Sequence, residues 1–167
     1  MRLAVGTVVV HPAHGVGHVT VRERRSIGGV EQDVTVIELD DGLSVTLPLD
    51  RAREVLRPPI GQSEIRQIEE TLSDEHVASD DVWSKRVGQA QEKLKNDDPL
   101  ELAEIVRDGA RRERGSEGRS GSKLSASERS LYMKARELLS AEIGFVQGRS
   151  KAEANDWIDE QLAAGDG

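Results

Sequence analysis

The apolar residues of this chain follow a strand-like pattern up to about residue 60 and a helical pattern after it. In the stretch from Leu43 to Leu47, apolar and polar residues alternate, which is typical of a sheet buried on one face. From Ile65 onward they recur every three or four positions, which is typical of an amphipathic helix. Because the two patterns are segregated, a doubly wound parallel sheet is not expected. We predict an α+β protein of two domains, residues 1–58 and 59–167.

The first domain has the pattern of consecutive antiparallel hairpins. Between Val8 and Val21, two runs rich in β-branched residues flank a segment with Pro12 and Gly15, and such a segment reverses the chain. Gly28-Gly29 can supply the positive φ angles of a second tight turn. The remaining expected elements are strands at 32–39, 43–47 and 55–57 and one helical turn at 50–53. This pattern predicts a small β-barrel of the Tudor-like or SH3-like kind.

The second domain has the spacing and the end signals of five helices. Ser125 with Glu128, and Ser150 with Glu153, match the capping box, in which each side chain satisfies a free backbone N–H group. Ser63 is expected to cap the first helix. Loops are expected at 73–81 and 115–123. Five helices are enough for a compact bundle.

The composition narrows the class of protein. The 167 residues include no cysteine, which excludes disulfides and thiolate metal sites and favours a reducing, cytoplasmic compartment. No apolar run is long enough to cross a membrane. Because motifs for nucleotide binding or for a catalytic nucleophile are missing, we expect neither an enzyme nor a cofactor. The net charge of −8 argues against a general nucleic-acid coat protein and confines any DNA contact to a local patch.

Three histidines, His11, His14 and His18, form the one histidine cluster in the sequence. Spacings of three and four suit metal ligands on a helix, but strand alternation and the intervening turn separate these side chains. We expect them to have turn and packing roles and no metal. The alternative is a metal-dependent enzyme that uses this cluster.

Trp83 follows Asp80-Asp81 and precedes Ser84, Lys85 and Arg86, so its indole has charged and polar neighbours. One interpretation is that Trp83 packs under the preceding loop. The other is an exposed aromatic wedge that inserts at a base step in the minor groove of DNA. Further along, Arg107, Arg111, Arg114 and Arg119 form the most basic stretch, which is either a solvated helix face or a patch that contacts the DNA backbone.

Four long segments of the chain match the pattern of a known family. They read VGTVVVHPAHGVGHV, VWSKRVGQAQEKL, PLELAEIVRDGARRE and LSASERSLYMKARELLSAEI. Together they resemble the CarD/CdnL family of bacterial transcription regulators. The resemblance covers nearly the whole chain in the right order. The first domain is also similar to the polymerase-interacting domain of the transcription-repair coupling factor, but this chain is too short to hold that protein's helicase motor.

The resemblance implies a Tudor-like domain that binds the β subunit of RNA polymerase and a helical domain that contacts promoter DNA. It implies that Trp83 wedges into the minor groove at the upstream edge of the transcription bubble and slows bubble collapse, with Lys85 and Arg86 as basic residues behind it. Arg25 matches a polymerase-contacting arginine, and Ile27 lies beside it. We therefore expect a monomeric regulator that stabilises the open promoter complex.

The sequence departs from the family pattern at three positions. Thr46 stands where many members have a second polymerase-contacting arginine, and Val87 and Gly88 stand where they have an aromatic residue and a lysine. Fewer cations imply weaker and less salt-sensitive DNA binding. The alternative function is therefore a polymerase-binding adaptor with little or no DNA contact.

Overall fold

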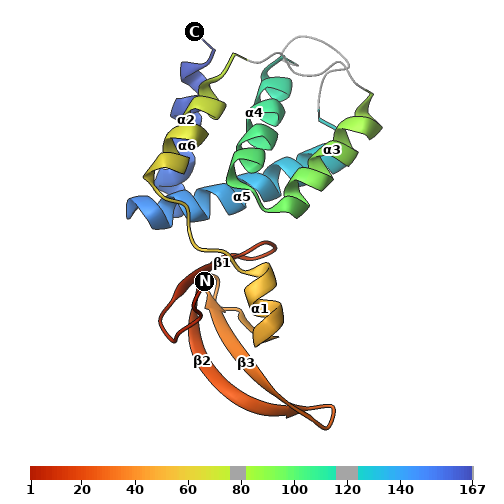
Figure 1. Ribbon diagram of the computed structural model, residues 1–167. Coiled ribbons are helices and arrows are strands. Elements are labelled where there is room, and N and C mark those ends of the chain that lie inside the picture. Colours follow the sequence, from red (N-terminus) through yellow and green to blue (C-terminus); the bar gives the residue numbers. More distant parts are fainter. Residues whose placement is uncertain (76–81, 116–123, 167) are drawn as a thin grey trace. The chain divides into compact units, whose positions relative to one another are not determined.

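The computed structural model describes residues 1–75, 82–115 and 124–166, and these divide into two compact units (Figure 1). The first unit is Met1–Pro59 and the second is Ile60–Gly167. The class is α+β, with strands in the first unit and helices dominating the second. No helix in the described part of the chain is long and apolar enough to span a membrane.

The first unit contains a curled, four-stranded antiparallel sheet with the order β1-β2-β3-β4 (Figure 1). Both hairpins expected near its start are confirmed, and Gly28 and Gly29 have φ angles of +60° and +80° at the second turn. A β-bulge between Val19 and Val21 shifts the register of β2 against β3. The strands are β1 (Val8–His11), β2 (Gly15–Ile27), β3 (Val30–Leu39) and β4 (Ser44–Pro48).

The sheet does not close into the barrel that the sequence pattern predicted. The segment 55–57, expected as a closing strand, instead contributes Val55 to the end of helix α1 (Leu49–Val55) and Arg57 to a single bridge with Val10. The expected single turn at 50–53 is thus a complete helix, because Leu49 and Ala52 bury their side chains against the sheet. The described chain therefore has six helices rather than five, and its sheet is a half-barrel.

The core of the first unit lies between one face of the sheet and α1. Gly17 permits the close pairing of β2 and β3, because a Cβ atom at this position would lie 2.7 Å from the carbonyl oxygen of Glu38. The core side chains are Leu3, Val9, Val19, Ile37, Leu39, Leu49, Ala52 and Leu56.

The described part of the second unit contains five helices. The capping boxes expected at the starts of α5 and α6 are confirmed, with the side chains of Ser125 and Ser150 accepting hydrogen bonds from the N–H groups of Glu128 and Glu153. At α2 the cap is Gly61, two residues before the expected Ser63, whose hydroxyl instead donates to Glu64. The helices are α2 (Gln62–Ser73), α3 (Trp83–Asn96), α4 (Pro99–Gly115), α5 (Ala126–Gln147) and α6 (Lys151–Ala164).

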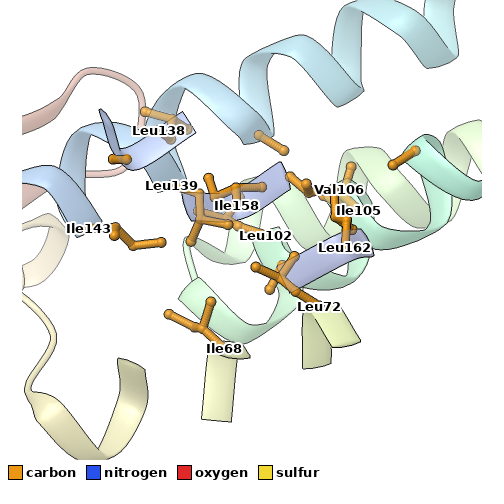
Figure 2. Close-up of a cluster of buried hydrophobic side chains, with 14 of the residues drawn as sticks. Ile68, Leu72, Leu102, Ile105, Val106, Leu138, Leu139, Ile143, Ile158 and Leu162 are labelled. Atoms are coloured by element: carbon orange, nitrogen blue, oxygen red, sulfur yellow. The ribbon is translucent and has the colours of Figure 1, made fainter. Parts of the chain in front are cut away.

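Aliphatic side chains from α2, α4, α5 and α6 meet in the main core of this unit (Figure 2). α4 and α5 approach closely at Gly109, where a Cβ atom would lie 2.4 Å from the ring of Tyr132. The side chains labelled in Figure 2 are Ile68, Leu72, Leu102, Ile105, Val106, Leu138, Leu139, Ile143, Ile158 and Leu162. α3 contributes least, since Val87 is the one residue of this helix that is buried.

Candidate protein and nucleic-acid interfaces

Trp83 is the first residue of α3, and its side chain is exposed. The carbonyl oxygen of Val82 accepts hydrogen bonds from the N–H groups of Lys85 (3.0 Å) and Arg86 (3.2 Å), which form the first turn of the helix. Trp83 remains 58% accessible, and the neighbouring Val82 is also exposed. By contrast, Trp157 on α6 is half-buried and packs against the core. Trp83 is therefore not part of the described core, and most of the loop under which one interpretation placed it lies outside the described residues.

Arg86 lies one turn after Trp83 but points toward α5. Its Nε atom donates to Oε1 of Glu128 over 2.7 Å, and the Arg86 side chain is only 21% exposed. The other carboxylate oxygen of Glu128 accepts from the backbone N–H of Ser125 over 2.8 Å. Arg86 therefore joins α3 to the capping box that begins α5.

Glu128 holds its negative charge in a buried position, with 8% of its side chain exposed. Burial raises the pKa of its carboxyl group, but hydrogen bonds from Arg86 and from the Ser125 backbone outweigh that effect. The net result is a pKa below the ordinary value of 4.5. At neutral pH the Arg86–Glu128 contact is therefore a hydrogen-bonded ion pair.

The other basic residues of α3 lie closer to solvent. Lys85 is exposed on the first turn. Lys93 reaches Glu104 of α4 at 2.6 Å, in a pair whose two side chains are each about one-third exposed. Gly88 faces open space, since a Cβ atom there would meet nothing within 4 Å. The outer surface around Trp83 thus carries Lys85, whereas the charge of Arg86 is directed inward.

The basic stretch of α4 is largely engaged in ion pairs within the second unit. Arg107 is buried, with 9% of its side chain exposed, and it pairs with Asp74 at 3.5 Å and with Asp108 at 2.8 Å. Arg114 forms an ion pair with Asp166 near the end of the chain. Arg111 is half-buried on the same helix, and Arg119 lies outside the described residues. This stretch therefore joins neighbouring segments rather than presenting a continuous basic surface.

In the first unit, the register places Arg25, Ile27 and Thr46 on one face of the sheet. Arg25 pairs with Gln32 and Ile27 with Val30 on β3, and Thr46 pairs with Val36 of the same strand. Because these three β3 partners are separated by even numbers of residues, their side chains share a face. The partners of Arg25 and Thr46 are four residues apart along β3, which is roughly 13 Å. The sequence-predicted residues therefore share the face opposite the core residues Ile37 and Leu39, and this face also carries the buried Val34.

The parts of β2 and β3 nearest their turn extend beyond the other strands (Figure 1). β1 pairs with β2 over 15–18 and β4 pairs with β3 over 34–38, so residues 24–27 and 30–33 pair only with each other among the described strands. We call this two-stranded part the β2–β3 ribbon. It carries Arg25, which is about half exposed and paired with Glu23, and its outer strand edges are open.

The histidine cluster lies in and beside the β1–β2 turn. The rings of His11 and His14 are 4.8 Å apart, whereas His18 is exposed on β2. Burial, followed by the neighbouring His14, lowers the pKa of His11. The nitrogen Nδ1 of His11 accepts a hydrogen bond from the Ala13 N–H group, which stabilises the turn. Among the described residues, no group of three potential metal ligands comes together.

Glu128 is a residue of this interface that the sequence pattern identified only as a helix cap. The capping-box motif at Ser125 indicated its backbone role but gave no sign of its pairing with Arg86, which lies 42 residues earlier. The sequence itself shows that the basic residues Lys85 and Arg86 follow Trp83. Its inward direction at Arg86 depends on how α3 packs against α5.

Comparison with known protein families gives two matches, one in each unit. Residues 67–159 match the family model for the CarD C-terminal domain. Residues 3–60 match the model for the CarD-like/TRCF RID domain. Together the matches cover the β sheet, α1 and the helices that carry Trp83, Arg86 and Glu128.

Proposed function

The chain belongs to the CarD family of RNA polymerase-interacting, non-enzymatic transcription factors, and from this premise we propose that it stabilises the open promoter complex. The first unit binds the β subunit of RNA polymerase. The second unit presents Trp83 to the minor groove at the upstream edge of the transcription bubble. A monomer carries both contacts.

The β2–β3 ribbon supports the proposed polymerase contact. Its open strand edges offer backbone N–H and C=O groups to which a strand of a partner can add, a mode in which main-chain hydrogen bonds supply affinity and side chains supply specificity. Arg25, Ile27 and Thr46 share the adjoining face and would read the partner's side chains. Thr46 contributes no charge, so Arg25 would be the main ionic contact of this set.

The exposure of Trp83 is the observation that carries the proposed DNA contact. A large aromatic side chain at the start of a helix, 58% accessible, has the shape of a wedge that enters between base pairs. Unstacking a base step costs a few kcal/mol, which the contacts permitted by the distorted DNA offset. Such a contact is local and therefore compatible with a net charge of −8, because recruitment depends on the polymerase rather than on phosphate binding.

The experiment that tests this function is the lifetime of the open complex formed by the cognate polymerase on a ribosomal-type promoter. We expect the native protein to lengthen this lifetime and Trp83→Ala to remove the effect while polymerase binding is retained. Phe145→Ala is the matched control, since Phe145 is an exposed aromatic residue on α5 of the same unit. Equal lifetimes with native protein and Trp83→Ala would contradict the wedge.

A second candidate function is that of an adaptor whose helical unit binds a protein instead of DNA. The ion pairs of Arg86 and Arg107 favour it, because they engage two of the basic residues expected to face phosphates. An adaptor would bind polymerase with native affinity, leave the open-complex lifetime unchanged and show no dependence on Trp83. The same lifetime assay therefore separates the two functions.

A further inference from the structure

The start of α3 has few apolar contacts to hold it in place. Val87 is its one buried residue, and Ala90 and Leu94, which pack at the edge of the core, lie toward the middle and end of the helix. Trp83 and Val82 themselves face solvent. An aromatic side chain can insert between base pairs only if the helix that carries it keeps a fixed orientation. The contacts that hold the first turn of α3 therefore determine how Trp83 is presented.

One contact near Trp83 on the helix is the ion pair between Arg86 and Glu128. Arg86 lies three residues after Trp83, a rise of about 4.5 Å along the helix axis. Its guanidinium group contacts a carboxylate that is itself held by the backbone of Ser125. Glu128 is therefore fixed at the start of α5, and it anchors the first turn of α3 to that helix.

We propose that Arg86 and Glu128 form a positioning clamp that sets the orientation of Trp83, and that Arg86 acts through Glu128 rather than by contacting DNA. This inference rests on the proposed function of Trp83 as a wedge. Glu128 thereby becomes a residue on which promoter binding depends although it is buried. The clamp works at neutral pH because both partners are charged.

Two features indicate that this pair orients α3 and is more than a surface contact. The Glu128 side chain is 8% exposed, whereas the Lys93–Glu104 pair further along α3 is about one-third exposed on each side. Exposed pairs contribute little, but a carboxylate that is buried and hydrogen-bonded from two directions accepts few alternative geometries. The planar guanidinium group adds directionality that an ammonium group lacks.

The test uses full-length protein in a Trp157→Phe background, so that fluorescence reports on Trp83 alone. Glu128→Gln removes the charge but keeps a side chain suited to the capping box, and Arg86→Gln leaves that box untouched. Glu113→Gln is the matched control, because Glu113 of α4 forms a more exposed ion pair with Arg129, the residue that follows Glu128 on α5. Fluorescence anisotropy of Trp83, circular dichroism, polymerase affinity and open-complex lifetime are measured for each.

We expect both clamp variants to keep their helical content and polymerase affinity, to lower the anisotropy of Trp83, and to reduce the lengthening of the open-complex lifetime by about fivefold. Their effects should be non-additive in the double variant, since each removes the same contact. The control variant Glu113→Gln should change neither the anisotropy of Trp83 nor the open-complex lifetime. Should one clamp variant fail to fold, the other decides the question.

Native anisotropy in both clamp variants would overturn the clamp. So would a loss of lifetime with Arg86→Gln but not with Glu128→Gln, because that pattern means that Arg86 contacts DNA directly. If Trp83→Ala leaves the lifetime unchanged, the wedge function fails, and the anisotropy measurement still decides whether the pair holds Trp83 in place. The two failures are thus distinguishable.

Discussion

The two surfaces proposed to contact partners, the β2–β3 ribbon and the start of α3, are held in place by different kinds of interaction. The ribbon depends on a continuous ladder of backbone pairs from Arg24 to Ile27 against Val30 to Asp33. The start of α3 depends on an ion pair between side chains 42 residues apart. Substitutions at the surface of the ribbon should therefore change recognition alone, whereas substitutions beneath α3 should change the geometry of the wedge.

The same difference affects how each surface avoids unwanted contacts. Open strand edges are sites of self-association, and the ribbon carries charged side chains at Arg24, Arg25, Glu31 and Asp33, which oppose pairing between copies. The exposed Trp83 instead stands beside Lys85 on a helix, whose backbone groups pair within the helix beyond its first turn. Charge on the ribbon thus faces solvent, while charge near Trp83 is divided between solvent and the interior.

The largest expected effect is that of Arg25→Glu. It is the most direct test of the claim that substitutions on the ribbon change recognition without changing the fold. We expect it to weaken polymerase binding by at least about thirtyfold, or ~2 kcal/mol, because a reversed charge at a contact leaves the partner's charged group unpaired. The fold should be unchanged, since Arg25 is about half exposed. Binding of the full-length protein to purified polymerase measures the effect.

Arg24→Glu is the matched control for this substitution. Arg24 pairs with Asp33 and therefore points to the opposite face of the ribbon from Arg25. We expect it to retain most of the affinity. Equal losses for the two variants would mean that binding depends on total charge, and unchanged affinity in Arg25→Glu would remove this face from the interface.

A smaller effect is expected on the pH dependence of stability in the second unit. It tests the claim that an ion pair holds the start of α3. The pKa of Glu128 is lower in the folded chain than its ordinary value of 4.5, so its contribution to stability is present above that value and is lost as the pH falls through the lowered pKa. Denaturant titrations at pH 7 and at pH 3 should show a greater loss of stability for the native chain than for Glu128→Gln. Equal losses in the two chains would contradict the buried ion pair.

The smallest expected effect comes from Gly88→Lys, which adds charge to the outer surface of α3. A side chain fits there because a Cβ atom meets nothing within 4 Å. The helix should gain about 1 kcal/mol, and one further phosphate contact should steepen the salt dependence of DNA binding by about one unit in the log–log slope. Gly88→Ala is the control, since it provides the helix gain without the charge. An unchanged salt slope in Gly88→Lys would mean that this surface does not face DNA.

Local sequence patterns predicted the elements whose determinants lie within a few residues. The Gly28-Gly29 turn and the capping boxes at Ser125 and Ser150 were all identified from such patterns and are confirmed. The prediction of a closing strand at 55–57 was wrong, because Val55 ends a helix that packs its Leu49 and Ala52 side chains into the core. A short apolar segment fits a strand or a helix equally well until its packing partner is known.

The candidate interfaces likewise depend on packing partners that the local sequence does not reveal. A charged segment around Trp83 could be located in the sequence, but its division between solvent and interior could not, since that depends on where α5 and Glu128 lie. Arg107 is a parallel case. Its spacing suggested a basic surface, yet the fold brings it against Asp74, 33 residues away, and buries it.

The sequence by itself determined the α+β class, the change from strands to helices near residue 60, and the positions of turns and caps, because each follows from periodicity or from side chains that bond their own backbone. Only the tertiary structure decided that the sheet stays open and that Trp83 is exposed while Arg86 turns inward. These features depend on contacts between residues distant in the chain. Burial and long-range ion pairing are properties of the packed chain, and no local pattern contains them.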